Sequence, residues 1–272
     1  MRTRRGPALA PVTALATVAL AVACSSGALT RHPAPALRSL AASTATTADT
    51  AALGTLEQLP DGRSYWLAAA AGGGAHPLLL VLHGLYLSPQ NVAAQTHVVA
   101  WARAHRVTLA FPVGVHATWA AGRTCCGYAS STHVDDVAYL RAVVADVEHR
   151  TVVDRRRIAA MGDSLGGMMA LRAACAAPTV FRLGAAVGGP LLVGCPRGNL
   201  IRLRGQHDRT VPAEGGYDRY LRTTLPSLAQ ERRLLGPHAR ERVVVWSGGH
   251  AWPQAADGLD ATALIGGALL RL

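Results

Sequence analysis

The sequence contains no lysine, so all 27 of its basic residues are arginine, against 16 acidic residues. The resulting net charge of +11 favours anionic lipid headgroups or acidic polymers as partners on electrostatic grounds. The arginines are scattered, however, and aromatic residues, which include only two phenylalanines, make up 5% of the chain. Because no binding motif and no interleaved aromatic residues accompany the charge, nucleic acid is not predicted as a partner.

The sequence also lacks, near its start, an uninterrupted apolar segment long enough to span a membrane. The apolar stretch at residues 8–23 is short, contains Pro11 and follows a basic segment, which is typical of a signal peptide. We therefore predict a signal peptide over residues 1–23. Residues 24–56 are rich in Ala, Thr, Ser and Pro without periodicity and predict a flexible tether. Residues 57–272 remain for one folded domain.

Two interpretations of the cleavage site stay open. Ala21-Val22-Ala23 fits the small-x-small rule of ordinary secretion, whereas Leu20 to Cys24 resembles a bacterial lipobox in which Cys24 is lipidated. A polar Ser25-Ser26 pair directly after Cys24 favours the lipoprotein, although Ala21 stands where such boxes usually have leucine. Either way the protein is predicted to be exported, and to be extracellular or anchored to the outer face of the cell membrane. The membrane is expected as a partner only through that anchor.

Spacings typical of metal sites are missing, since neither Cys-x-x-Cys nor His-x-x-x-His occurs, and no metal is predicted. Four cysteines remain after Cys24, namely Cys125, Cys126, Cys175 and Cys195. An even number in an exported chain predicts two disulfides, with the connectivity left open. Because a bond between neighbouring cysteines would strain the peptide between them, we expect Cys125 and Cys126 each to reach a distant partner.

Short apolar runs alternate with segments of helical spacing after residue 57. Predicted strands cover residues 63–67, 77–82, 107–112, 158–161, 183–187, 200–203 and 242–246; predicted helices cover 91–105, 134–149, the segment after Ser164, 216–230 and 254–270. Runs without polar alternation are typical of strands buried on both faces of a parallel sheet. The sequence thus predicts an α/β fold with a mostly parallel central sheet, helices on both faces, and a single domain without internal repeats.

The segment at residues 157–167 has the order of a nucleophile elbow. An apolar strand enters Gly162-Asp163-Ser164-Leu165-Gly166, and a helical segment leaves it. The turn brings the backbone on either side of Ser164 so close that side chains at Gly162 and Gly166 would clash. Ser164 is the predicted nucleophile, and a serine hydroxyl needs an adjacent base to attack at neutral pH.

The acid and the base are expected after later strands, in the order serine, acid, histidine. Asp208 follows the strand at residues 200–203, and His250 lies in the loop after residues 242–246. His207 adjoins Asp208 and is expected to point elsewhere, while Asp218 falls inside a predicted helix. Ser164, Asp208 and His250 therefore form the predicted triad, with Asp208 orienting His250.

The oxyanion hole is expected to combine two backbone N–H groups. One belongs to Leu165, directly after the nucleophile, and the other to the loop after the strand at residues 77–82. Leu85 is the predicted donor in that loop. His83 is predicted to organise the loop by hydrogen bonds rather than to carry a proton.

Several spaced motifs now coincide. They are His83-Gly84, Phe-Pro-Val-Gly at 111–114, Trp-Ala-Ala-Gly at 119–122, Cys-Cys-Gly at 125–127, Val-Asp-Asp-Val at 134–137, and the segments 162–170, 205–212 and 248–253. From Arg63 to its end the chain resembles the poly(3-hydroxybutyrate) depolymerase and feruloyl esterase group of α/β hydrolases, which includes exported esterase lipoproteins of actinobacteria. The resemblance implies an α/β-hydrolase fold and assigns the same triad.

The chain departs from that group where Val113, Ala120 and Leu165 replace the residues the group often has. These departures leave the triad intact and bear on the substrate. Trp119, Tyr128 and Trp252 are predicted to line an acyl or aromatic pocket.

The predicted function is that of a secreted serine esterase that forms an acyl-enzyme on Ser164 and requires no cofactor. Its expected substrate is a small or oligomeric ester of the short-chain, hydroxyalkanoate, feruloyl or acetyl type. Two alternatives remain: a non-catalytic cell-envelope binding protein that retained the fold, and a serine peptidase of the same fold.

Overall fold

The computed structural model describes residues 53–218 and 221–272, so the predicted signal peptide, Cys24 and most of the predicted tether lie outside the described residues. The described residues all belong to one of the two units into which the chain divides, Ser43–Leu272. The described residues begin slightly before the predicted boundary at residue 57. Leu53 is fully buried, and the first strand begins at Thr55 because it pairs with the next strand along the chain.

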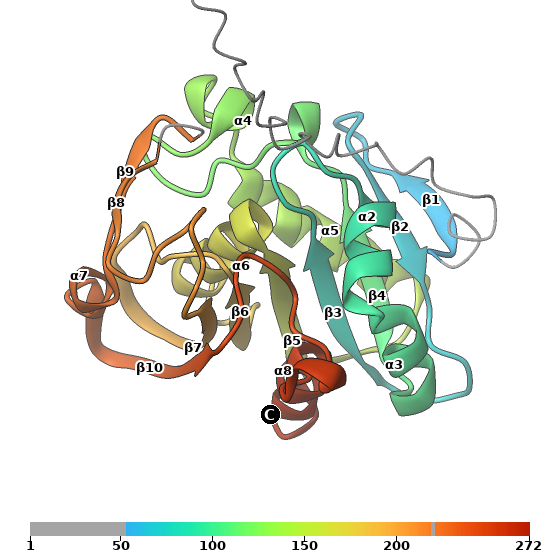
Figure 1. Ribbon diagram of the computed structural model, residues 1–272. Helices are drawn as coiled ribbons and strands as arrows, with labels where there is room; N and C mark the ends of the chain where they lie inside the picture. Colours follow the sequence, from blue (N-terminus) through green and yellow to red (C-terminus); the bar gives the residue numbers. More distant parts are fainter. Residues whose placement is uncertain (1–52, 219–220) are drawn as a thin grey trace, which may run out of the picture. The chain divides into compact units, whose positions relative to one another are not determined.

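Eight strands form the central sheet in the order β1-β2-β4-β3-β5-β6-β7-β10 (Figure 1). Their bounds are β1 Thr55–Gln58, β2 Ser64–Ala68, β3 His76–Leu82, β4 Thr108–Pro112, β5 Val153–Asp163, β6 Leu183–Val187, β7 Cys195–Gly205 and β10 Leu235–Trp246. All pairings from β4 to β10 are parallel, and only the pairings of β2 with β1 and with β4, at one edge, are antiparallel. The predicted, mostly parallel sheet is confirmed.

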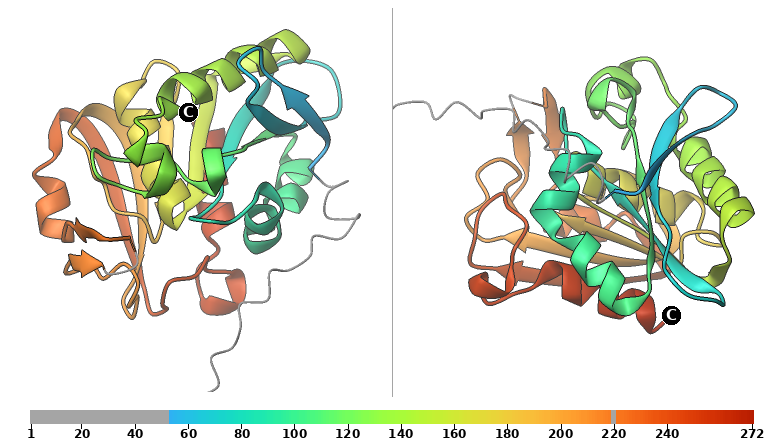
Figure 2. Two further views of the ribbon diagram at one scale, coloured as in Figure 1. Left: turned by 90° about the horizontal axis from the view of Figure 1, so that it is seen from above. Right: turned by 90° about the vertical axis from the view of Figure 1, so that its right-hand side faces the viewer.

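Helices cover both faces of this sheet (Figure 2). One face packs against α5 Asp136–Arg150 and α6 Ser164–Ala176, and the other against α2 Pro89–Thr96, α3 Val98–His105 and α8 Ala261–Leu270. Strand β3 is buried along its whole length: Leu78, Leu80 and Leu82 enter the first core, whereas Leu79 and Val81 enter the second. Side chains alternate across a strand, so one apolar run supplies two cores. No helix among the described residues is long and apolar enough to cross a membrane.

The predicted helix over residues 216–230 is wrong. The segment forms a small antiparallel hairpin of β8 Gly216–Asp218 and β9 Thr223–Leu225, followed by the short helix α7 Leu228–Arg232. β-branched residues in β9 suit a strand, and Pro226 lacks the N–H that a continuous helix requires.

Two other predicted helices are shorter than expected. The one over residues 91–105 is broken into α2 and α3 at His97, which has a φ of 52°. The last one begins only at Ala261, where the Asp260 side chain accepts from the Ala263 N–H at 2.9 Å and caps the helix. The remaining short elements are η1 Val115–Ala117, α4 Gly127–Ser131 and η2 Ala255–Asp257.

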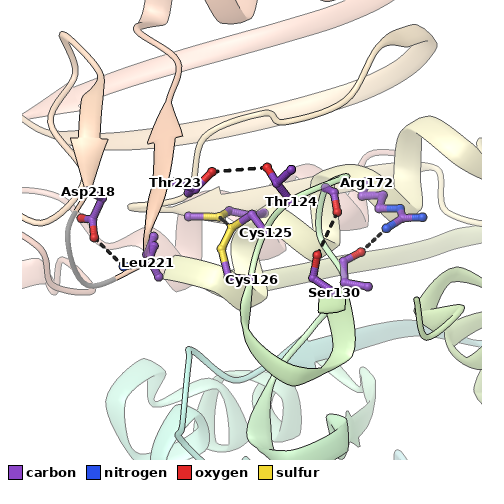
Figure 3. The surroundings of a disulfide bond; sticks show 11 residues. Thr124, Cys125, Cys126, Ser130, Arg172, Asp218, Leu221 and Thr223 are labelled. Atoms are coloured by element: carbon purple, nitrogen blue, oxygen red, sulfur yellow. Dashed lines mark hydrogen bonds between the residues drawn. A yellow bond between two sulfur atoms is a disulfide. The ribbon is translucent and has the colours of Figure 1, made fainter. Parts of the chain in front are cut away.

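Two disulfides are present among the described residues, but their connectivity corrects the prediction. Cys175 near the end of α6 bonds to Cys195 at the start of β7, with Cα atoms 4.8 Å apart. Cys125 bonds to its neighbour Cys126 rather than to a distant partner (Figure 3). The peptide between these two residues is cis, and their Cα atoms lie 2.9 Å apart.

Candidate active site

Ser164 lies at the tip of a strand–turn–helix junction, as predicted. It follows the last residue of β5 and begins α6 with a φ of 51°, a left-handed conformation that non-glycine residues rarely adopt. A Cβ at Gly162 would lie 2.4 Å from the Gly166 carbonyl carbon across the turn, and one at Gly166 would lie 2.2 Å from the Leu82 carbonyl oxygen at the end of β3. These two glycines therefore permit the turn that leaves Ser164 partly exposed at the edge of the sheet.

Asp208 and His250 follow neighbouring strands and meet at the same edge. β7 pairs in parallel with β10, and the loops after them carry the acid and the histidine. His250 Nδ1 lies 2.7 Å from Asp208 Oδ2. The other carboxylate oxygen accepts from the N–H groups of Thr210 at 2.9 Å and Val211 at 2.7 Å. The structure thus brings the predicted acid and base together and fixes the carboxylate from both sides.

Asp208 and His250 shift each other's pKa. Burial alone would raise the pKa of Asp208, but the hydrogen bonds from His250 and from the Val211 and Thr210 N–H groups hold it below its ordinary value. Burial likewise disfavours the charged imidazole, yet the hydrogen bond and negative charge of Asp208 raise the pKa of His250. With Nδ1–H donating to Asp208, Nε2 is left as the acceptor for a serine proton.

Gly188 and Gly189, directly after β6, lie between His250 and the serine turn. A Cβ at Gly188 would lie 2.9 Å from His250 Cε1, and one at Gly189 would lie 2.6 Å from the Ser164 carbonyl oxygen. Among the described residues the His250 ring bonds only to Asp208, so no hydrogen bond joins it to Ser164 Oγ. Catalytic hydrogen bonds in ligand-free sites often form only when substrate binds, so the geometry suits the predicted triad.

The two predicted oxyanion donors come from neighbouring strand ends. Leu82 of β3 is in register with Gly162 of β5, so the loops after both strands lie at one edge. The Leu165 N–H is in the first turn of α6, where amides lack intrahelical acceptors. In the β3 loop the N–H groups of Tyr86 and Leu87 donate to backbone carbonyls, while that of Leu85 has no acceptor among the described residues.

His83 holds this loop in place, as expected. It is buried, its Nδ1–H donates to the Gly84 carbonyl at 2.9 Å, and its Nε2 accepts from the Gly114 N–H at 3.0 Å. Burial lowers the pKa of His83 to about 4, so the imidazole is neutral at physiological pH. Its role is to fix the loop that carries Leu85.

The predicted substrate pocket needs correction at two of its three residues. Trp119 is fully buried and donates its Nε1–H to the His83 carbonyl at 2.9 Å. Trp252 is 4% exposed and donates to Thr262 Oγ1 at 3.0 Å. Both indoles are core residues with no free face for a substrate. Tyr128 is 48% exposed and contacts His116 edge-on, with the ring centroids 4.2 Å apart.

His207 and Asp218, the two alternatives set aside in favour of the predicted base and acid, make other contacts. His207 is exposed and its Nδ1 bonds to the Ser247 carbonyl oxygen at 2.8 Å. Asp218 lies in the β8–β9 hairpin, where it accepts from the Leu221 N–H at 2.6 Å. Neither side chain takes part in the Asp208–His250 pair.

A buried ionic cluster supports the acid turn, and the sequence analysis missed it. Arg204 of β7 donates from Nη2 to the carbonyls of Val211 at 3.2 Å and Pro212 at 2.9 Å, which lie just after Asp208. Its Nη1 pairs with Glu231 at 2.8 Å, and Glu231 also accepts from the Leu191 N–H at 2.6 Å. The available signal was the alternation of Arg202 and Arg204 with Ile201 and Leu203 in β7.

Another buried carboxylate, that of Asp163, immediately precedes Ser164 in the chain. It is 6% exposed, and burial raises its pKa against the opposing effect of His250.

The described residues bring together no group of three His, Cys, Asp or Glu side chains that could hold a metal ion.

The elbow, the ordered triad positions and the parallel sheet define an α/β hydrolase. Solved structures share this fold. Native pOPH has a TM-score of 0.59 and 15% identity, covering 78% of this chain and 84% of that one. Acetyl xylan esterase 1 from Thermoanaerobacterium sp. has a TM-score of 0.53 and 14% identity, covering 79% and 82%. At such identities the likeness shows the fold alone.

The chain belongs to the family described as "Putative esterase", whose model matches residues 58–193, half of the chain. Feruloyl esterase C of Emericella nidulans is 30% identical over 168 residues, which cover 57% of this chain and 58% of that protein. "Putative esterase NocK" of Nocardia uniformis subsp. tsuyamanensis is 37% identical over 133 residues, 47% and 38% of the two chains. The chain thus spans less than two thirds of the length of these curated relatives.

The raised pKa of His250 predicts how turnover depends on pH. As pH falls through that value the imidazole takes up a proton and ceases to act as a base, so kcat/KM for an ester should fall at a pH above the ordinary value for histidine. Asp208→Asn should move this acid limb to lower pH and reduce kcat by about 10⁴-fold. Asp154→Asn, which removes a carboxylate paired with Arg157, is the control and should change neither. If the acid limb of the pH profile lies at the same pH in Asp208→Asn as in the wild type, Asp208 is not the partner of His250.

The ionic cluster predicts a stability effect. Arg204→Leu should lower the free energy of unfolding by about 3 kcal/mol, because it leaves Glu231 short of one buried partner. Arg232→Leu removes an arginine that is 70% exposed and 3.6 Å from Glu241, and should cost much less. Denaturant unfolding of both variants makes the comparison, and equal losses would show that burial of the Arg204 pair does not matter.

Proposed function

We propose that the protein hydrolyses carboxylic esters through an acyl-enzyme on Ser164. The observation that carries the proposal is the 2.7 Å contact between His250 and Asp208 at the sheet edge where the strained Ser164 turn also lies. Membership of the esterase family supports the same chemistry.

The residues divide the reaction as follows. His250 Nε2 removes the Ser164 proton as Oγ attacks the ester carbonyl, and Asp208 stabilises the imidazolium that forms. The N–H groups of Leu85 and Leu165 receive the negative charge on the carbonyl oxygen. His250 then protonates the leaving alcohol, and water activated by the same imidazole releases the acid and restores Ser164. No step requires a cofactor.

Ser164→Ala should reduce hydrolysis of short-chain p-nitrophenyl esters by about 10⁶-fold, because no other group takes the place of the nucleophile. The fold should be unchanged, as judged by circular dichroism and the unfolding transition. Ser64→Ala on β2, next to the edge strand β1, is the matched control and should keep full turnover. Retained hydrolysis in Ser164→Ala would remove this serine from the mechanism.

A fluorophosphonate probe separates this proposal from the alternatives. An esterase or a serine peptidase labels at Ser164, whereas a non-catalytic binding protein does not. A panel that includes feruloyl, acetyl, hydroxybutyryl and short-chain esters, together with matching peptides, then separates esterase from peptidase and identifies the acyl group. The name of feruloyl esterase C makes the feruloyl ester a substrate to include.

We also infer that the protein is exported and anchored by a lipid on Cys24. The two disulfides support export, because such bonds are rare in the reducing cytosol. In the producing bacterium, Cys24→Ser should shift the protein from the detergent phase to the aqueous phase of a membrane extract. Secretion of the unchanged chain without detergent partitioning would favour ordinary cleavage after Ala23.

A further inference from the structure

A cavity of about 470 Å³ lies beside the proposed oxyanion loop. Leu85 and Tyr86 form one wall, and Cys126 and Gly127 contribute another. Its volume falls in the range of small-molecule sites, about 300–1,000 Å³. A larger cavity of about 810 Å³ lies between β2 and α3 and contains none of the proposed catalytic residues. Neither cavity is lined by Ser164, Asp208 or His250, and the smaller one adjoins the proposed oxyanion loop through Leu85.

The cavity is held rigidly against the nucleophile helix. Cys125 Sγ lies 3.9 Å from Met168 Sδ, one turn after Ser164 on α6. On the other side, Thr124 Oγ1 and Thr223 Oγ1 lie 3.3 Å apart and join the disulfide loop to the β8–β9 hairpin (Figure 3). The loop that carries Arg123 and the hairpin that carries Arg222 are thereby placed relative to the active site.

The charge lining this cavity has one sign. Its charged lining residues are Arg123 and Arg222, and no aspartate or glutamate lines it. Within residues 53–218 and 221–272, neither arginine forms an ion pair, which is also true of other exposed arginines such as Arg103 and Arg141. The nearby Asp218 carboxylate accepts from the Leu221 N–H instead. Two arginines without counter-charges beside a cavity create a positive potential that attracts an anionic group.

We propose that this cavity binds a carboxylate on the substrate, so that the enzyme prefers esters carrying a free acid group near the scissile bond. The inference rests on the proposed esterase function and names its substrate class. Guanidinium groups bind carboxylates in a planar, two-point geometry that a neutral ester cannot match. Such substrates are half-esters of dicarboxylic acids and hydroxy-acid oligomers with a free carboxyl end.

Matched pairs of esters test the preference. The dimer of 3-hydroxybutyrate and its methyl ester differ by one negative charge on the alcohol side. Mono-p-nitrophenyl adipate and its methyl ester differ by the same charge on the acyl side. The wild type should show a higher kcat/KM for the acid in at least one pair, and the ratio should fall as salt rises because salt screens exposed charges.

Variants of Arg123 and Arg222 test whether these two residues cause the preference for the free acid. Arg123→Gln and Arg222→Gln should each lower kcat/KM for the acid by about fivefold, mainly through KM, and leave the methyl ester unchanged. Arg155→Gln, an exposed arginine paired with Glu148, is the control and should change neither substrate.

The possible failures are distinguishable. Turnover of the methyl esters with no acid preference in either pair, or a preference that survives in the Arg123→Gln Arg222→Gln double variant, overturns the carboxylate site but leaves the esterase proposal standing. A wild type that hydrolyses no ester and does not label with fluorophosphonate overturns both.

Discussion

The ion pair between Arg204 and Glu231 is the interaction on which the acid side of the site depends. It is almost completely buried, and Arg204 uses its second nitrogen to hold the two carbonyls that follow Asp208. Glu231 in turn fixes the Leu191 amide and pairs with Arg202. Removing charges from water is costly, so a cluster like this persists only where its hydrogen bonds are nearly complete. Here it joins β7, the acid turn and α7 into one rigid support.

The opposite side of the site depends on a neutral histidine. His83 donates to one backbone group and accepts from another, which fixes the β3 loop without adding a charge near the developing oxyanion. Trp119 packs against this ring with centroids 4.9 Å apart and so supports the same loop from the core. Charge is therefore placed on the side of the base, and neutral hydrogen bonds on the side of the oxyanion.

Much of this arrangement was readable from the sequence. Apolar runs such as Leu78–Leu82 are strands because only a doubly buried strand uses five consecutive large apolar residues. Asp208 and His250 were found because each follows such a run, in the order that the fold imposes. In these places local pattern and tertiary structure agree.

The failures share a physical cause, which is that long-range contacts overrode local pattern. Trp119 and Trp252 look like pocket residues in a loop sequence, but their indole nitrogens find buried acceptors at His83 and Thr262. The helical spacing at residues 216–230 gives way to a hairpin that packs on Thr124. The predicted distant partners of Cys125 and Cys126 are wrong, because the two cysteines bond to each other.

The Cys175–Cys195 bond joins the two catalytic elements at the ends remote from the site. α6 begins with Ser164 and reaches Cys175, while β7 begins with Cys195 and leads to Asp208. The disulfide therefore links α6, which begins with the proposed nucleophile, to β7, which leads to the proposed acid. Close to the site, β6 is hydrogen-bonded to both β5, which leads to Ser164, and β7, which leads to Asp208. The covalent link and the sheet thus hold the same two elements together at opposite ends, and the disulfide also lowers the entropy of the unfolded chain.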